Sequence, residues 1–408
     1  MPVSWKKTIA LFLASQTISL FGSSLVQYAI MWHITLTTQS GAMMTLSIVC
    51  GFLPTFFLSP FAGVWADRYS RKRLIMLSDS LIAAAALVLA ILFWRDNASL
   101  WLLFVMSAVR ALGTAVQTPA IGALLPQLVP EDQLTRVNAL NGSIQSLVML
   151  LSPMLSAALL TSTTIGFIFL IDVITAVIAV TIMLLFVRVP VHAKAKKGQA
   201  VSYFLDLRAG FSYIQHHRFV KTLFAFNAAL LVLVAPAAFL TPLQVTRSFG
   251  EDVWRLTAIE VAFSVGMTVG GFVMASWGGL RNRLHTMALS SMVIGFATVA
   301  LGIAPVFSIY LFFMGMIGIV LPIMNTPFTV LLQEKVEPDF LGRVFGVLGM
   351  ISSSMMPLGM LIFGPLADYV SVESLLVGSG ALMVVQSTFM LRNRVLLAAG
   401  QRRPEPEV

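Results

Sequence analysis

The sequence predicts an all-α membrane protein with twelve transmembrane helices in two pseudo-symmetric six-helix bundles. Three observations lead to this fold class: a low content of charged residues, a series of long apolar segments, and a repeat of the first half in the second. Of the 408 residues, only 11% are charged and 58% are hydrophobic, with a mean hydropathy of +0.90. Soluble domains carry roughly 25% charged residues. This chain therefore has too little polar surface to cover itself in water.

Apolar segments of about 20 residues, the length that spans a hydrocarbon core as a helix, recur along the chain. Residues 1–22 resemble a signal peptide, but the apolar character continues to Trp32, which favours a spanning helix. We expect spans at residues 8–33, 43–66, 73–94, 99–124, 138–161, 164–187, 219–246, 254–278, 285–304, 306–332, 342–368 and 373–392.

One long connection divides the spans into two sets of six, whereas most other connections are short. Its sequence is basic and polar, as expected for a segment at the membrane surface. The predicted organisation is an N-terminal bundle over 1–188, a cytoplasmic linker over 189–218, a C-terminal bundle over 219–395 and a cytoplasmic tail over 396–408.

Lysines and arginines indicate the orientation. With the N-terminus in the cytoplasm, all but four of the 26 basic residues fall on the cytoplasmic side; Arg95, Arg247 and Arg255 fall outside, and Arg110 lies within a helix. Basic residues concentrate in cytoplasmic loops of membrane proteins, so both termini are expected in the cytoplasm. This topology accounts for the net charge of +9 without a nucleic-acid partner.

A short motif recurs in register in the two halves. Between the fourth and fifth spans the chain reads Asp132-Gln-Leu-Thr-Arg136-Val, and between the tenth and eleventh it reads Asp339-Phe-Leu-Gly-Arg343-Val, 207 positions later. A basic cluster after the second span likewise returns after the eighth. Two parallel six-helix repeats are typical of transporters that alternate access to a site near the membrane midplane, between the halves.

The connection after the second span, GVWADRYSRKRL over residues 63–74, packs five charges into seven residues. Gly63 lets two helices approach closely, and Asp67 can accept hydrogen bonds from a neighbouring helix N-terminus. Arg71 and Arg73 can pair with acidic residues at adjoining cytoplasmic ends. We interpret this connection as a charge latch that closes the cytoplasmic face in one state. The alternative is a plain basic anchor loop.

This connection resembles motif A of the major facilitator superfamily. The fourth span carries Arg110-Ala-Leu-Gly and Gln117-Thr-Pro, which is similar to motif B of drug exporters in that superfamily, whereas only Ser152-Pro153 is left of motif C in the fifth span. Trp65 and Ser70 depart from the usual motif A residues. The residues that match motif A are Gly63, Asp67, Arg68, Arg71, Lys72 and Leu74. Arg73 adjoins them in the basic cluster and is included in the predicted latch.

Within the superfamily the chain most resembles the macrolide efflux (Mef-type) group of drug:proton antiporters, through the stretches GFLPTFFLSPFAGVWADRYSRKR, SAVRALGTAVQTPAIGALLPQLVPEDQLTR and LLQEKVEPDFLGRVFGVLG. The resemblance implies a multi-pass protein of the bacterial inner membrane that exports amphiphilic drugs by alternating access. The proton gradient would supply the energy, with no cofactor. The implied partners are the drug, protons and the lipid bilayer, for a protein that acts as a monomer; an auxiliary ATP-binding partner is left open.

The sequence also allows a second function class and disfavours a third. Related branches of the superfamily export siderophores, so the substrate could be a native metabolite, with drug export incidental. A receptor or scaffold without transport is disfavoured, because the linker and tails are too short for a signalling domain. No Walker A, GxSxG or HExxH motif is present, so no enzyme activity is expected. The adjacent His216 and His217 are expected to be solvated rather than metal-bound, and Cys50, the single cysteine, excludes disulfides within the chain.

Four ionisable residues lie inside predicted spans, where a charge costs at least ~2.5–3.5 kcal/mol on insertion scales. They are Asp79, Arg110, Asp172 and Glu260. Glu260 is the first candidate for proton coupling and Asp172 the second. Arg110 is expected to hold a carboxylate charged, or to respond when that carboxylate binds a proton; the alternative is a clamp on helix carbonyls. Asp79 is expected to be structural, pairing with the basic residues of motif A.

Polar stripes on several spans predict a cavity that is polar but mostly uncharged, because lipid-facing surfaces rarely carry amides. Methionine and tryptophan would supply an adaptable apolar lining. For any single polar residue, the alternative is an interhelical hydrogen bond worth ~0.6 kcal/mol. The expected lining residues are Gln16, Gln27, Met31, Trp32, Gln117, Asn141, Gln145, Asn227, Ser264 and Asn325.

Overall fold

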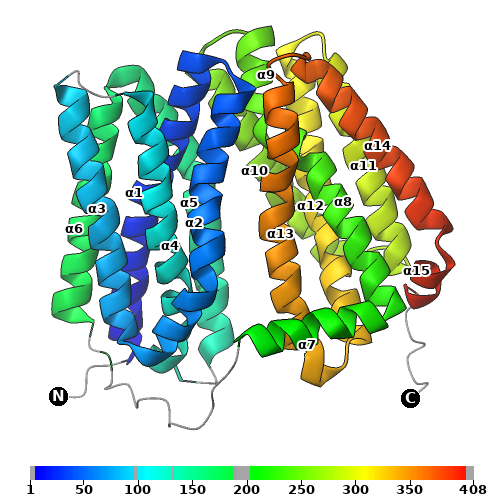
Figure 1. The fold of residues 1–408 in the computed structure, drawn as a ribbon, viewed down its shortest axis with the longest axis horizontal. Coiled ribbons are helices and arrows are strands. Elements are labelled where there is room, and N and C mark those ends of the chain that lie inside the picture. Colours follow the sequence, from blue (N-terminus) through cyan, green and yellow to red (C-terminus); the bar gives the residue numbers. More distant parts are fainter. Residues whose placement is uncertain (1–4, 96–98, 131–132, 188, 190–202, 401–408) are drawn as a thin grey trace. The chain divides into compact units, whose positions relative to one another are not determined.

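The computed structural model describes residues 5–95, 99–130, 133–187, 189 and 203–400, and for some residues within these ranges only the backbone. These residues form helices and short turns, without a β-strand (Figure 1). Within them, twelve helical segments are long and apolar enough to cross a membrane. The predicted fold class is therefore confirmed.

The chain divides into two compact units: residues 1–38 with 46–200, and residues 39–45 with 201–408. In the first unit, α1 packs against α4, α5 and α6, and α3 packs against α4 and α6. The helices that build this unit are α1 (Trp5–Thr38), α2 (Gly41–Arg68, from residue 46 on), α3 (Arg71–Trp94), α4 (Leu100–Leu128), α5 (Leu134–Ser162) and α6 (Ile165–Phe186).

The second unit repeats this packing. Here α8 packs against α13 and α14, as α1 does against α5 and α6, and α11 packs against α12 and α14, as α3 does against α4 and α6. The repeated short motif therefore reports a repeated architecture. The helices of this unit are α7 (Tyr203–His216), α8 (Arg218–Phe239), α9 (Thr241–Ser248), α10 (Val253–Trp277), α11 (Arg283–Ile303), α12 (Phe307–Lys335), α13 (Pro338–Leu366), α14 (Val372–Arg392) and α15 (Arg394–Ala399).

The span expected at 219–246 is two helices. Helix α8 ends at Phe239, and α9 begins at Thr241. Pro242 explains the break, because proline has no N–H to donate to the carbonyl of Ala238 and its ring clashes with that carbonyl. The short helix α9 carries Arg247 in its last turn.

Part of the expected linker is also helical. Helix α7 packs against α8 and α13, and Tyr213 stacks between Phe340 and His217, with ring centroids 4.6 and 3.8 Å apart. His217 is therefore packed, whereas His216 is exposed. The expectation that both histidines are solvated is wrong for His217. Residues 188 and 190–202 lie outside the described part.

Close helix contacts at glycines position the ionisable residues. A Cβ atom at Gly22 of α1 would lie 2.0 Å from the Thr175 hydroxyl oxygen of α6, one turn from Asp172. A Cβ atom at Gly270 of α10 would lie 2.0 Å from the Ile319 carbonyl oxygen of α12. Small residues let membrane helices approach closely. Larger residues at these two positions would displace the helices that carry Asp172 and Glu260.

Candidate functional site

A buried ion pair joins three helices of the first unit. Arg110 Nη1 of α4 lies 2.7 Å from Asp172 Oδ2 of α6, and both side chains are at most 8% exposed. Arg110 Nη2 also donates to the Ser23 carbonyl of α1 at 2.6 Å, and the Ser23 hydroxyl donates weakly to Asp172 Oδ1 at 3.4 Å. Arg110 therefore contacts both a carboxylate and a helix carbonyl, the two roles that its position in the sequence indicated.

Asp79 lies in a separate part of the same buried network. Its Oδ1 accepts hydrogen bonds from the Ser19 hydroxyl of α1 at 2.6 Å and from Gln117 Nε2 of α4 at 2.8 Å. Its Oδ2 is buried and has no hydrogen-bond partner among the described residues. Asp79 is 2% exposed.

The expected pairing of Asp79 with the basic residues of motif A is not found. Eight residues separate Asp79 from Arg71, which is about 12 Å along a helix. Arg71 instead donates to the carbonyls of Ala66 and Ala123, both at 2.9 Å. Asp79 is too deep in the helix to reach this group.

The motif A cations lie at helix ends. Lys72 Nζ donates to the carbonyls of Val187 at 2.8 Å and Leu184 at 3.2 Å, where α6 ends. Cations near helix C-termini are stabilised by the helix dipole. Arg71 and Lys72 thus tie α2, α4 and α6 together within the first unit. Arg68 and Arg73 are exposed.

Several predicted latch residues lie outside what the structure describes. Arg343 is described, with its guanidinium over the Phe340 ring at 5.5 Å. In the second unit, Arg283 of the repeated basic cluster pairs with Glu334 at the end of α12, which is the kind of pairing that was expected of the motif A arginines. The undescribed positions are residue Asp132, the side chains of Asp67, Arg136 and Asp339, and the surroundings of Gly63.

Glu260 is an acid of the second unit that lies well inside a spanning helix, whereas Glu334 and Glu373 lie at the ends of theirs. It is partly buried in α10, with Ser264 one turn further along. No described residue forms a hydrogen bond or ion pair with its carboxyl group. Glu260 therefore differs from Asp172, which has a buried cation beside it.

The second unit also holds a small cavity between α8, α11, α12 and α14, which brings two predicted lining residues together. Asn227 and Asn325 line it with Gln386, whose Nε2 donates to the Phe226 carbonyl and whose Oε1 is buried without a partner in the described residues. The cavity of about 30 Å³ holds one or two waters, far less than a drug-sized ligand needs. A wider groove of about 870 Å³ between α8 and α14 shares Phe226 and Gln386.

The other predicted lining residues fall into different environments. Trp32 is fully buried, with 0% exposure, so it packs in the interior of the first unit rather than lining an open cavity. Gln16 is buried too, and its Oε1 has no described partner. Met31 and Asn141 are partly buried, and Gln27 and Gln145 are exposed. Periodicity alone did not separate interior from cavity-facing positions.

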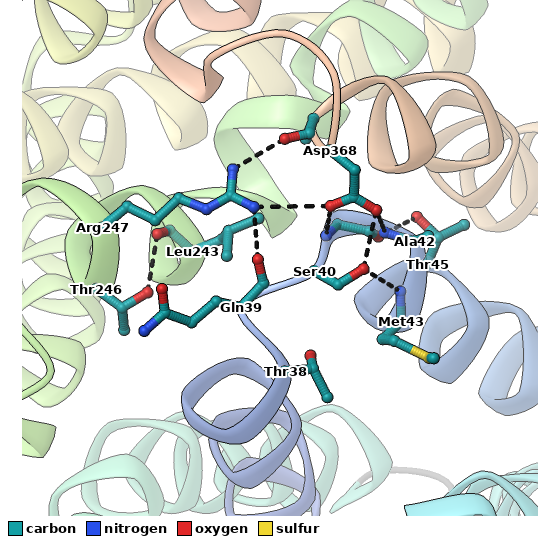
Figure 2. Close-up of polar contacts among 12 residues, drawn as sticks. Thr38, Gln39, Ser40, Ala42, Met43, Thr45, Leu243, Thr246, Arg247 and Asp368 are labelled. Carbon is teal, nitrogen blue, oxygen red and sulfur yellow. Dashed lines mark hydrogen bonds and ion pairs between the residues drawn. The ribbon is translucent and has the colours of Figure 1, made fainter.

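A polar cluster that sequence reasoning missed surrounds Asp368, where α13 has just ended (Figure 2). Its carboxylate accepts from the backbone N–H groups of Gly41 at 2.7 Å and Ala42 at 3.0 Å, and from the Ser40 hydroxyl at 2.9 Å. It therefore caps the N-terminus of α2, where free N–H groups and the helix dipole favour an anion. Residues 39–45 belong to the second unit, and these hydrogen bonds to Asp368 are among the contacts that join them to it.

Arg247 completes this cluster. One guanidinium nitrogen donates to the Ala367 carbonyl at 2.9 Å, and the other donates to the Gln39 carbonyl and lies 3.7 Å from Asp368. Gln39 has a φ of +46°, a left-handed conformation that a non-glycine residue adopts only when its surroundings hold it there. By the positive-inside prediction, this cluster lies on the external side.

We expect Asp368→Ala to release the first turn of α2. Hydrogen bonds to charged groups contribute ~1.5–3 kcal/mol, so amide hydrogen exchange at Gly41 and Ala42 should rise at least about tenfold. Asp252→Asn is a matched control, since Asp252 forms an exposed pair with Arg255 in the same unit. Unchanged protection of the two amides in Asp368→Ala would contradict the capping role.

Comparison with known proteins identifies a family, related sequences and similar structures. The sequence profile of the Major Facilitator Superfamily matches residues 9–360. Macrolide efflux protein A of Streptococcus pyogenes is 30% identical over 383 residues, 93% of this chain and 94% of that protein. The Staphyloferrin A transporter of Staphylococcus aureus is 22% identical over 88% of this chain and 89% of its own length. The crystal structure of the nucleoside transporter NupG matches with a TM-score of 0.69 at 16% identity, covering 96% of this chain and 99% of that one.

Proposed function

Since this chain belongs to the major facilitator superfamily, we propose that it is a proton-coupled antiporter that exports amphiphilic, macrolide-like drugs by alternating access. Members of this superfamily transport small molecules and are not enzymes. The chain is a multi-pass membrane protein of bacterial type. Proton coupling and the macrolide-like substrate are the proposed steps beyond these statements.

The observation that carries the proton coupling is the set of acids held inside spanning helices. Asp79, Asp172 and Glu260 all lie well within helices long enough to cross a membrane. Charges at such depth are costly and mark proton or ion pathways. Glu260 has no described cation partner, so it can exchange a proton without leaving a buried cation unpaired. The proton gradient would drive export without a cofactor, in a protein that acts as a monomer.

The substrate class is supported by the relationship to Macrolide efflux protein A and by the polar, uncharged amides on several helices. Arg110 is the buried cation among the described residues of the spans, and Asp172 already neutralises it. A neutral or cationic amphiphile meets no uncompensated positive charge there.

A second candidate is the export of a native metabolite such as a siderophore, which the relationship to the Staphyloferrin A transporter favours. An anionic metabolite would need cationic side chains along its path. The engagement of Arg110 by Asp172 argues against this candidate.

Expression in an efflux-deficient bacterial host tests the proposal. We expect a higher minimum inhibitory concentration for macrolides and lower macrolide accumulation, with both effects removed by a protonophore. Unchanged macrolide susceptibility would reject the substrate class. Efflux that survives the protonophore but stops when ATP is depleted would reject proton coupling and indicate an auxiliary ATP-binding partner.

A further inference from the structure

We propose that Asp79, rather than Asp172, is the proton-binding carboxyl group of the first unit, with Oδ2 as the atom that takes the proton. This inference deepens the proposed proton coupling and rests on it for its role in transport. It reverses the order of the two acids that their positions in the sequence indicated. The geometry around the two carboxyl groups is the reason.

Asp172 already forms an ion pair with a cation. Its Oδ2 forms the 2.7 Å ion pair with Arg110, in a place where both side chains are buried. Arginine keeps its proton in proteins, so a proton on Asp172 would leave a buried guanidinium without a counter-charge. Breaking a buried pair in this way is strongly unfavourable. Asp172 therefore serves as the counter-charge of Arg110 in this structure.

Asp79 has the opposite surroundings. The two groups that donate to Oδ1, the Ser19 hydroxyl and the Gln117 amide, are neutral. No lysine, arginine or histidine among the described residues forms an ion pair with Asp79. Asp172 of α6 is close enough to repel a charge on Asp79, and Arg110 of α4 pairs with Asp172. On α3 itself, the basic residues lie two turns away.

A second unsatisfied atom indicates where the proton would point. Gln16 lies one turn before Ser19 on α1, so the two share a face of that helix. Gln16 Oε1 is buried and, like Asp79 Oδ2, has no hydrogen-bond partner in the described part of the chain. Both atoms are acceptors when Asp79 is ionised, so neither can satisfy the other. A proton on Oδ2 turns that oxygen into a donor, and we infer that it would point to Gln16 Oε1, a buried acceptor one turn from the Ser19 that contacts Asp79.

Proton binding at this position has a structural consequence. The charge on Asp79 strengthens the hydrogen bonds from Ser19 and Gln117, which join α3 to α1 and α4. Neutralising the charge weakens both links at once. Gln117 lies two residues before Pro119, a proline inside α4. Loss of the proton would tighten this contact beside a proline, and gain of the proton would loosen it.

Infrared difference spectroscopy of the full-length protein in liposomes, recorded between acidic and alkaline pH, tests the assignment without any substrate. Because Glu260 is itself proposed to exchange a proton, every comparison is made in the Glu260→Gln background, which should show the carbonyl stretch of a protonated carboxylic acid that disappears at alkaline pH. Asp79→Asn should lose this band, and the double variant Arg110→Leu with Asp172→Leu should keep it. A band that survives in Asp79→Asn, or that is lost only in the double variant, overturns the proposal.

Gln16→Leu provides a second variant that leaves the carboxyl group in place. Removal of the acceptor should shift the Asp79 band to higher frequency without abolishing it; an unshifted band overturns the assignment of Gln16. Export assays separate this inference from the proposed function. If the band belongs to Asp79 while wild-type export ignores the proton gradient, the proton site stands and the coupling proposal fails. If export is proton-driven and Asp79→Asn exports as well as the wild type, Asp79 is not the coupling acid.

Discussion

Asp172→Leu should destabilise the protein by about 3–5 kcal/mol, the usual cost of leaving one partner of a buried ion pair without its counter-charge. Among its described contacts, Arg110 would retain the hydrogen bond to the Ser23 carbonyl. In a unit of this size, such a loss lowers the apparent Tm by about 10 °C. Thermal unfolding of detergent-solubilised protein, with every variant heated at the same rate, measures the effect.

The double variant separates the pair from its surroundings. Replacing buried ion pairs with apolar residues is often neutral or stabilising, so Arg110→Leu combined with Asp172→Leu should recover most of the lost stability. Asp252→Asn removes an exposed ion pair with Arg255, in which the Asp252 side chain is 59% exposed. This substitution should change the free energy of unfolding by less than about 1 kcal/mol. A single Asp172→Leu variant as stable as the wild type would show that Arg110 does not depend on Asp172.

Sequence reasoning predicted the fold because hydropathy and segment length are local properties. The predicted spans 73–94 and 373–392 lie within two residues of α3 and α14. The break between α8 and α9 was also readable, since Pro242 stands inside the predicted span. Helix α7 was not, because it depends on contacts such as the stacking of Tyr213 on Phe340, more than a hundred residues away.

The candidate site was only partly predictable for a related reason. Burial cost correctly singled out the ionisable residues of the spans, but not which acid Arg110 would contact, since Asp79 and Asp172 both lie on helices that pack near α4. Which acid pairs with Arg110 depends on the close approach of α1 to α6 at Gly22. That approach is a tertiary contact, which the sequence does not show. Asp368 was missed because its partners, residues 40–42, lie more than 320 positions away. A carboxylate just after a spanning helix gives no sign in the sequence that it caps another helix.

Glu260→Gln should abolish gradient-driven export while leaving drug binding partly intact. Glutamine has nearly the same shape as glutamic acid and keeps its hydrogen-bonding capacity, but it cannot exchange a proton. Drug uptake into inverted vesicles driven by an imposed proton gradient should therefore fall to background. Exchange of labelled for unlabelled drug without a gradient should persist, because exchange needs binding and access but no net proton movement.

Glu337→Gln is the matched control, an exposed glutamate at the start of α13 in the same unit, and should export like the wild type. Full gradient-driven export by Glu260→Gln would remove Glu260 from the mechanism. Asp79 and Glu260 each lie at least one turn inside a described span and form no described ion pair, one in each unit. If both carry protons, Asp79→Asn should lower the number of protons moved per drug. If Glu260 alone carries them, the Asp79 variant should retain the wild-type ratio.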